Sequence, residues 1–315
     1  MKNKLILTFS LAFGLSSLLA GPTLAAGSRV VQQLPSGTVD WANQWIEATG
    51  SGLSKATGNP AQERLLAQRA AMSDAYRQLA ETVHGVKVDA ETLVRNYVTE
   101  SDLIRTRVDG VIKGAQPVGA PRIGADGETL ITLRMPLYGQ NQLSGAIQLD
   151  QRVRQRRQSQ APSQRDPQSL ARLLHDSRQR DLPFFPLRLA AGIGLVPARL
   201  AAGPSYTGLV LDMCNLPLQP AMSPAVFGES QQVYIGNFPI DPDQVIAEGV
   251  LQYYGDFGAA LESPRVGAHP LVVEALGADN SQTDILVSEA DAERIRQADQ
   301  SGQFLKQLKV VVASE

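Results

Sequence analysis

The segment from Asn59 to Gly85 predicts one long helix, which constrains the fold more than any other feature of the sequence. Asn59 is a good N-cap, and Pro60 suits the first helical position because its missing N–H is not needed there. Apolar residues recur at helical spacing along one stripe: Leu65, Met72, Tyr76, Leu79 and Val83. Part of the helix surface carries only small side chains, those of Ala67, Ala70, Ala71 and Ala75. Such a helix favours close packing on a β-sheet.

The segments around this helix have the patterns of short strands. Residues 41–49 come before it and end at the breaker Gly-Ser-Gly. Residues 114–123 and 128–137 flank an Asp-Gly turn, which is a hairpin signal. Ser101 can cap a second, shorter helix. Residues 36–139 therefore predict an α+β domain, a small antiparallel sheet packed with one long and one short helix.

Residues 204–315 predict a second domain, a β-rich α+β unit. Its strand candidates are rich in branched and aromatic residues: 208–212, 232–235, 249–254, 270–275, 284–287 and 308–313. Asp241 and Ser288 are expected to cap two helices. Between the first two strands lies an apolar loop that either contacts a partner or covers a sheet edge. Its apolar residues are Leu216, Pro217, Leu218, Pro220 and Met222.

The stretch 140–203 differs in composition and predicts a linker rich in Arg, Gln and Pro. Four arginines lie close together at its start: Arg152, Arg154, Arg156 and Arg157. Such a basic stretch can bind phosphate, lipopolysaccharide or anionic lipid headgroups. The alternative is a solvated linker or a polar surface helix, which needs no ligand.

The first 25 residues have the pattern of a secretory signal peptide. Lys2 and Lys4 precede an apolar run from Leu5 to Ala20, and small residues follow a helix-breaking Gly-Pro pair. Cleavage after Ala25 leaves small residues at the two positions that require them. The apolar run is shorter than the roughly 20 residues that a bilayer span needs. We therefore expect an exported protein, periplasmic or peripherally associated with the outer membrane.

Charge and cysteine content exclude further classes. Removal of residues 1–25 lowers the formal charge from −2 to −4, because Lys2 and Lys4 are lost, so no nucleic-acid partner is expected. Cys214 is the single cysteine, so no internal disulfide can form. It lies in an apolar stretch and is expected to be a buried, inert thiol. With no cysteine near the expected cleavage site, a released protein is expected rather than a lipid-tethered one.

The residues that could support catalysis are few and scattered. The three histidines, His84, His175 and His269, lie in different segments, so no metal site is predicted. Cys214 and His269 share the second domain and form the one conceivable nucleophile–base pair, although nothing local positions them. We therefore predict no catalytic, cofactor-binding or metal-binding residues, and expect a protein that is not an enzyme.

The helix carries a recognisable sequence from Ala67 to Glu81, Ala-Gln-Arg-Ala-Ala-Met-Ser-Asp-Ala-Tyr-Arg-Gln-Leu-Ala-Glu. Together with Val86 to Asp89, Gly110 to Ala115 and the Asp-Gly hairpin, it resembles the Lpp-twenty family of bacterial outer-membrane lipoproteins. The N-terminal domain of flagellar assembly protein T is similar over the same stretch. The resemblance implies a small α+β envelope domain without known catalytic residues. The region from Tyr206 to Asp212 is similar to a C-terminal part of some longer relatives.

The expected function is a non-enzymatic cell-envelope protein with a structural or assembly role, linked to the outer membrane or to flagellar structures through the resemblance. Its partners would be envelope or flagellar proteins. One alternative is a glycan- or lipid-binding module that uses the basic linker. A second alternative is a hydrolase that uses Cys214 and His269.

Overall fold

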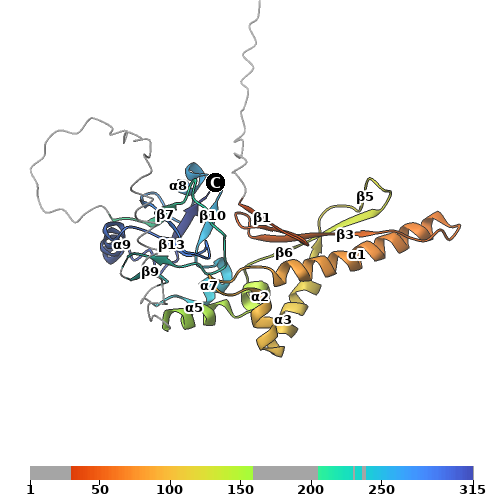
Figure 1. The fold of residues 1–315 in the computed structure, drawn as a ribbon, viewed down its shortest axis with the longest axis horizontal. Coiled ribbons are helices and arrows are strands. Elements are labelled where there is room, and N and C mark those ends of the chain that lie inside the picture. The colour runs from red at the N-terminus through yellow and green to blue at the C-terminus, as the bar shows by residue number, and fades with distance from the viewer. Residues whose placement is uncertain (1–29, 159–204, 230, 236–238, 315) are drawn as a thin grey trace, which may run out of the picture.

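The computed structural model describes residues 30–158, 205–229, 231–235 and 239–314. They form two units, residues 30–158 and the described residues from 205 onward (Figure 1). The first unit extends away from the second as a long layer of sheet and helix, and the second unit is more rounded. The expected signal peptide lies outside these residues. None of the helices that are described has the length and apolarity needed to cross a bilayer.

The first unit is one antiparallel sheet with helices on one face, as the sequence predicts. The sheet order is β1-β2-β3-β6-β4, and β5 also pairs with β6. Its strands are β1 (Val31–Leu34), β2 (Gly37–Asp40), β3 (Trp45–Gly52), β4 (Gln116–Pro117), β5 (Arg122–Ile123) and β6 (Thr129–Pro136). Its helices are α1 (Pro60–His84), α2 (Val94–Glu100), α3 (Asp102–Lys113), α4 (Leu143–Ala146) and α5 (Leu149–Gln158).

Helix α1 confirms the prediction from the sequence at both ends. The Asn59 side chain accepts hydrogen bonds from two backbone N–H groups of the first turn, and the helix ends at His84 before Gly85. Its buried residues include Ala67, Ala71, Ala75 and Leu79, so the alanines are the surface that lies on the sheet. The 25-residue helix is about 37 Å long at 1.5 Å per residue, and it runs along β3 (Figure 1).

The second unit contains two four-stranded sheets. In the first, β10-β14-β7-β11, every neighbouring pair is parallel. The second has the order β12-β13-β8-β9 and mixes parallel and antiparallel pairs. The strands are β7 (Gly208–Asp212), β8 (Val226–Phe227), β9 (Gln232–Tyr234), β10 (Gln252–Tyr254), β11 (Pro270–Glu274), β12 (Gly277–Ala278), β13 (Ile285–Leu286) and β14 (Val310–Ala313). The helices are α7 (Pro242–Glu248), α8 (Phe257–Leu261) and α9 (Glu289–Gly302).

The expected α+β class is confirmed in both units, and the caps predicted at Asp241 and Ser288 open α7 and α9. The parallel pairing of the first sheet was not predicted. Parallel strands need crossover connections, and the helices between these strands provide them. The second unit therefore has a parallel sheet where the sequence pattern indicated only short strands.

The stretch 140–158 is not a linker, which differs from the prediction for 140–203. It forms α4 and α5, and its apolar side chains join the core: Leu143, Ala146, Ile147, Leu149 and Val153 are all buried. In α5, Leu149 and Val153 are four residues apart, so they share one helix face, and Arg156 continues that face one turn further on. The remainder of the predicted linker, 159–204, lies outside the residues that the structure describes.

Close contact between β3 and α1 gives a test of this packing. A Cβ added at Gly50 would lie 2.0 Å from the Ala75 backbone nitrogen and 2.4 Å from the Ala71 carbonyl oxygen. Gly50→Ala should therefore lower the free energy of unfolding by about 3 kcal/mol, because the helix and strand must separate. Urea denaturation measures this change.

Gly110→Ala is the matched control for that variant. Its Cβ would meet nothing within 4 Å, in the interior of α3, so the variant should gain about 0.5–1 kcal/mol from helix propensity. Equal stability of Gly50→Ala and the unchanged protein would contradict the tight packing of α1 on β3.

Candidate functional site

The junction between the two units contains a continuous apolar core. Buried side chains from both units belong to one cluster. Trp41 of the first unit and Tyr253 of the second lie edge to face, with ring centroids 5.8 Å apart. The Tyr253 hydroxyl accepts a hydrogen bond from the Ala221 N–H at 3.0 Å and donates to the Ala221 carbonyl at 3.1 Å. Two units that bury apolar surface in this way form one body.

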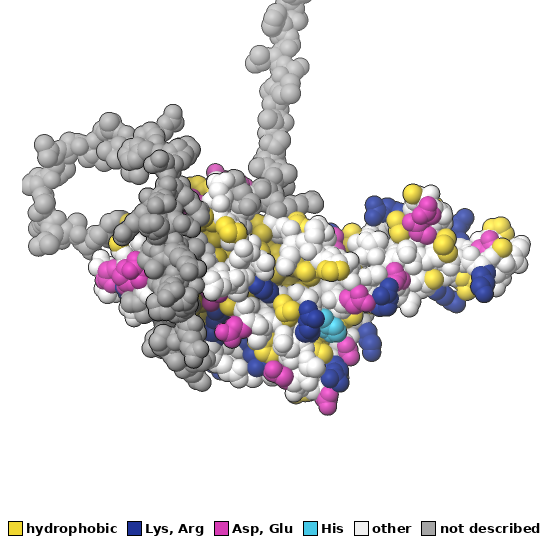
Figure 2. Space-filling view, viewed as in Figure 1, with side chains coloured by type: hydrophobic (Ala, Val, Ile, Leu, Met, Phe, Trp, Pro, Cys, Tyr) yellow, Lys and Arg dark blue, Asp and Glu magenta, His cyan; other side chains and the backbone are white. Residues whose placement is uncertain are grey.

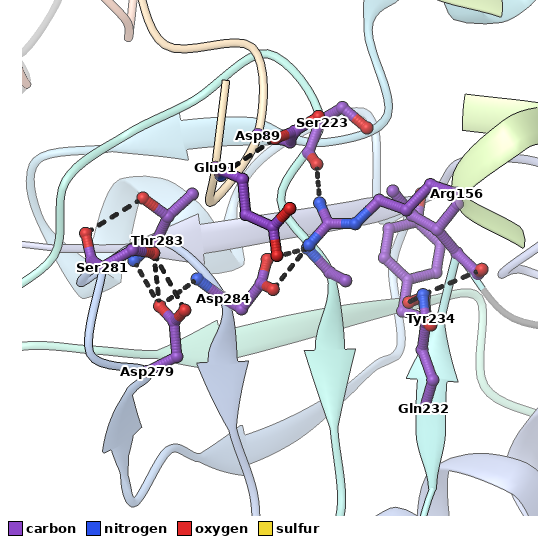
Figure 3. A network of polar contacts seen from close by, with 12 residues as sticks. Asp89, Glu91, Arg156, Ser223, Gln232, Tyr234, Asp279, Ser281, Thr283 and Asp284 are labelled. Carbon is purple, nitrogen blue, oxygen red and sulfur yellow. Dashed lines mark hydrogen bonds and ion pairs between the residues drawn. The ribbon is translucent and has the colours of Figure 1, made fainter. Parts of the chain in front are cut away.

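Polar contacts also join the two units. The first of them is made by Arg156, which extends from α5 into the second unit. Its guanidinium donates hydrogen bonds to the Ser223 carbonyl and to the Asp284 carboxylate (Figure 3). From the first unit, Lys87 Nζ donates to the Ser281 carbonyl at 2.8 Å and to Thr283 Oγ1 at 2.9 Å. We call Arg156, Ser223, Lys87, Thr283 and Asp284 the junction cluster.

The acidic member of this cluster is buried. Asp284 is 3% exposed, and burial raises the pKa of its carboxyl, although Arg156 and the Ala225 N–H both act to lower it. Asp279 lies beside it and accepts hydrogen bonds from the N–H groups of Thr283 and Asp284. The carboxylate of Asp284 therefore depends on the Arg156 charge for much of its stabilisation.

The apolar loop after β7 lies on the first unit. The N–H of Met222 donates to the Lys87 carbonyl at 3.0 Å, and the N–H of Ser223 donates to the Val88 carbonyl at 2.7 Å. Met222 is buried, and Leu216 and Leu218 pack on the shared core. This loop therefore covers the first unit within the same chain, in place of the partner contact or sheet edge that the sequence left open.

The arginines of α5 make contacts within the chain. The Arg152 guanidinium lies 4.0 Å from the centroid of the Tyr97 ring, and Arg154 forms an ion pair with Asp150. Arg156 belongs to the junction cluster, and the side chain of Arg157 lies outside the described residues. Anion binding by these four residues stays a prediction, and three of them already have a structural role.

The conceivable pair Cys214 and His269 is not brought together. In the parallel register Gly208 pairs with Pro270 and Asp212 with Glu274, so His269 precedes one end of the strands and Cys214 follows the other. The five-residue strand alone spans about 13 Å at roughly 3.3 Å per residue. A nucleophile and its base need hydrogen-bond contact. The structure therefore overturns the hydrolase alternative that used this pair.

The two remaining histidines and the carboxylates form no metal site within the described residues. His84 ends α1 with its Nε2 buried and without a hydrogen-bond partner among the described residues, and His175 lies outside them. Asp241 caps α7 by accepting from the Asp243 N–H at 3.0 Å. In the described ranges no group of three or more His, Cys, Asp or Glu residues is arranged to hold a metal ion.

The free end of the first unit forms an arm, which we define as residues 50–70 and 118–130. Five of the eight large apolar side chains that are exposed in the described ranges lie on it: Leu53, Leu65, Leu66, Val118 and Ile123. Strand register places Ile123 opposite Thr129, and Thr129 opposite Gly52. Leu53 and Ile123 therefore lie at the same level of the arm, where apolar and charged side chains meet at the surface (Figure 2).

A pocket of about 630 Å³ lies beside the junction, between α3, α4, the start of α5 and α7. Both units line it, because Gln142 and Gln151 come from the first and Ile246 from the second. Two hydrogen bonds hold this wall in place: the Ile246 carbonyl accepts from the Gly139 N–H at 2.8 Å and from the Ser144 hydroxyl at 2.7 Å. Sequence reasoning missed this pocket, because its lining residues come from three separate segments.

The junction cluster gives a prediction with a pH dependence. Arg156→Met removes the charge that lowers the pKa of Asp284, so that pKa rises further in the folded protein. When the pKa of Asp284 is higher in the folded than in the unfolded protein, its burial costs no stability below about pH 4. Stability is then lost as the pH rises through the folded pKa. The variant should therefore lose about 3 kcal/mol of unfolding free energy at pH 7 and less near pH 4. Urea denaturation at both pH values measures it.

Two further variants serve as controls for this experiment. Arg154→Met removes a more exposed ion pair from the same helix, so it should cost less than about 1 kcal/mol. Adding Asp284→Asn to Arg156→Met should restore part of the stability, because the buried charge is gone. A loss in Arg156→Met that is independent of pH would contradict the role given to Asp284.

Comparisons with known proteins match each unit separately. Residues 42–125 match the family model described as LPP20 lipoprotein, which supports the Lpp-twenty resemblance. Residues 208–315 match the model of the second domain of Treponema pallidum Tp0624. Likeness to flagellar assembly protein T is not among these findings, and no curated protein matches the chain. The first unit is thus similar to the LPP20 lipoproteins, a family of envelope-associated proteins, and the second unit to the Treponema domain.

Proposed function

We propose that this protein is a non-enzymatic structural or assembly component of the cell envelope, and that its arm contacts a partner protein. The match of residues 42–125 to LPP20 lipoproteins supports the envelope association. The observation that carries the proposal is the arm, where exposed apolar side chains gather at the free end of a rigid layer.

The build of the arm suits a contact surface. Helix α1 lies close on β3, with the Gly50 and Gly52 positions in near contact with its backbone, so strand and helix are packed tightly where the arm begins. Leu53 and Ile123 are 68% and 71% exposed, which is unfavourable for large apolar side chains in water unless a partner covers them. A stiff surface loses little conformational entropy on binding.

Charges on the arm favour a protein partner with carboxylates around an apolar surface. Glu63 accepts hydrogen bonds from the N–H groups of Thr57 and Gly58, and Glu128 accepts from Asp126, so these carboxylates organise the loops. The basic residues of the arm make no ion pair within the described part of the chain: Lys55, Arg64, Arg69 and Arg122. Mixed apolar and basic surfaces of this kind fit a complementary acidic partner.

The location that goes with this role is the periplasm, with peripheral association at the outer membrane. The basic and apolar start of the chain, residues 1–25, supports export. A flagellar partner is the narrower form of the proposal and rests on the sequence resemblance alone. Cell fractionation tests the location: full-length protein in the cytoplasm, with residues 1–25 retained, would contradict it.

Site-specific photo-crosslinking tests the arm. A photoreactive amino acid at Leu66 or at Ile123 should give the same protein adduct in envelope fractions, because both positions are exposed on the arm. The same amino acid at Arg294, an exposed position on α9, should give no such adduct. Mass spectrometry of the adducts identifies the partner.

The double variant Leu66→Ser/Ile123→Ser is the matched functional control. Both side chains are exposed, so the free energy of unfolding should change by less than about 1 kcal/mol. The protein should keep its location in the envelope but lose the adduct formed from a third arm position, Leu53. Equal adducts from Arg294, or adducts with lipid alone, would refute the arm as a protein-binding surface.

A further inference from the structure

The pocket beside the junction has the size of a small-molecule site. Its volume of about 630 Å³ lies within the range of roughly 300–1,000 Å³ that ligand pockets occupy. Four helices line it, α3, α4, α5 and α7, so it presents no free strand edge to which an extended peptide could add. The ligand must therefore be recognised by side chains and by the shape of the wall.

Amide side chains dominate the polar part of the wall. Asn141, Gln142, Gln148 and Gln151 line the pocket, and within the described residues their side-chain amides have no hydrogen-bond partner in the protein. Gln142 and Gln148 are half-buried, and Asn141 and Gln151 are exposed at the rim. Each amide offers two donors and an acceptor. These amides can therefore form hydrogen bonds with a ligand whose groups both donate and accept, as hydroxyl and acetamido groups do.

The rest of the wall is small or apolar. Gly110 and Val111 of α3 and its C-cap Gly114 line the pocket together with Ala146 of α4 and Ile246 of α7. None of the apolar side chains in the lining is larger than that of Ile246. A pyranose ring has the matching character, with C–H groups on its faces and hydroxyl groups at its edge.

The charges favour a neutral ligand. Arg107 is the cationic residue of the wall, and Asp150 is its acidic residue, which forms an ion pair with Arg154. A phosphate or a polyanion is normally held by several basic groups or by helix N-termini, and one exposed arginine does not provide these. The amide wall therefore carries more of the recognition than charge does.

The backbone at the pocket is held in an uncommon conformation. Gln148 has a φ of 55°, in the left-handed region that residues other than glycine rarely adopt. This residue turns the chain between α4 and α5 and places its own side chain in the pocket wall.

We infer that the pocket binds a neutral saccharide that carries acetamido groups, such as a β-1,4-linked oligomer of N-acetylglucosamine. The amides pair with hydroxyl and acetamido groups, and the small apolar wall receives the ring face and the acetyl methyl. This site is separate from the arm, and it differs from the anion-binding role predicted for the arginines of α5. The saccharide is either part of a glycan polymer or a free oligosaccharide.

Isothermal titration with the tetramer of N-acetylglucosamine tests the inference on the full chain. The unchanged protein should bind it, and Asn141→Ala/Gln151→Ala should weaken binding at least tenfold, because two hydrogen-bonding side chains are lost. Gln62→Ala removes an exposed amide from the first turn of α1, away from the pocket, and should leave the affinity unchanged. A sulfated oligosaccharide of the same length should bind no more tightly than the neutral one.

A second variant blocks the pocket without removing any polar group. A Cβ at Gly110 meets nothing within 4 Å, so Gly110→Trp should fill the pocket while α3 stays folded. Asp109→Trp, on the same helix but outside the pocket lining, is its control and should still bind. The thermal midpoints of both variants verify folding before the titration.

Sedimentation with insoluble murein separates the two sources of the saccharide. Binding to murein that Gly110→Trp abolishes assigns the pocket to the polymer, and binding to the tetramer alone assigns it to a free oligosaccharide. Absence of both kinds of binding would overturn the inference, as would affinities that are the same in Gly110→Trp and the unchanged protein. These measurements are independent of the cellular location and of the arm adducts, so the proposed function is tested separately.

Discussion

Trp41 packs edge to face on Tyr253, and around this pair the apolar residues of both units form one buried cluster. The arm and the pocket both depend on this burial. Without it, the arm would not be fixed relative to the second unit, and the pocket would lose the wall that Ile246 supplies. Hydrophobic burial has no preferred direction. The hydrogen bonds of Lys87 and Arg156 then select one relative orientation of the units.

The polar part of the junction carries a cost that explains its arrangement. Burial of a carboxylate such as Asp284 is unfavourable unless charge and hydrogen bonds compensate for it. Here the Arg156 guanidinium and the Ala225 N–H both reach the carboxylate, and Arg156 also bonds the Ser223 carbonyl. Apolar residues in these positions would avoid the cost of burying charge, but they would allow several relative orientations of the two units. Arg156 therefore helps to specify the junction, which explains one of the arginines in a helix that resembles a linker by composition.

Helix ends could be predicted from the sequence because capping is local. Asn59, Asp241 and Ser288 each bond backbone N–H groups within three residues, so the signal lies in adjacent letters. Helix α5 was missed because only Leu149 and Val153 show its buried face. Parallel pairing in the second unit and the separation of Cys214 from His269 depend on contacts between distant segments. The pocket likewise combines residues 107–114, 140–151 and 246, which no local pattern connects.

A pocket whose wall comes from both units has a thermodynamic consequence. A ligand that touches α3, α4 and α7 together binds only while the units are joined, so its binding free energy adds to the stability of the junction. The same linkage holds in reverse, because changes that destabilise the junction must also lower the affinity of the pocket for its ligand. At a ligand concentration of 100 times the dissociation constant, the added stability is about 2.7 kcal/mol. That is comparable to the loss expected for Arg156→Met, so occupancy of the pocket and the integrity of the junction influence one another.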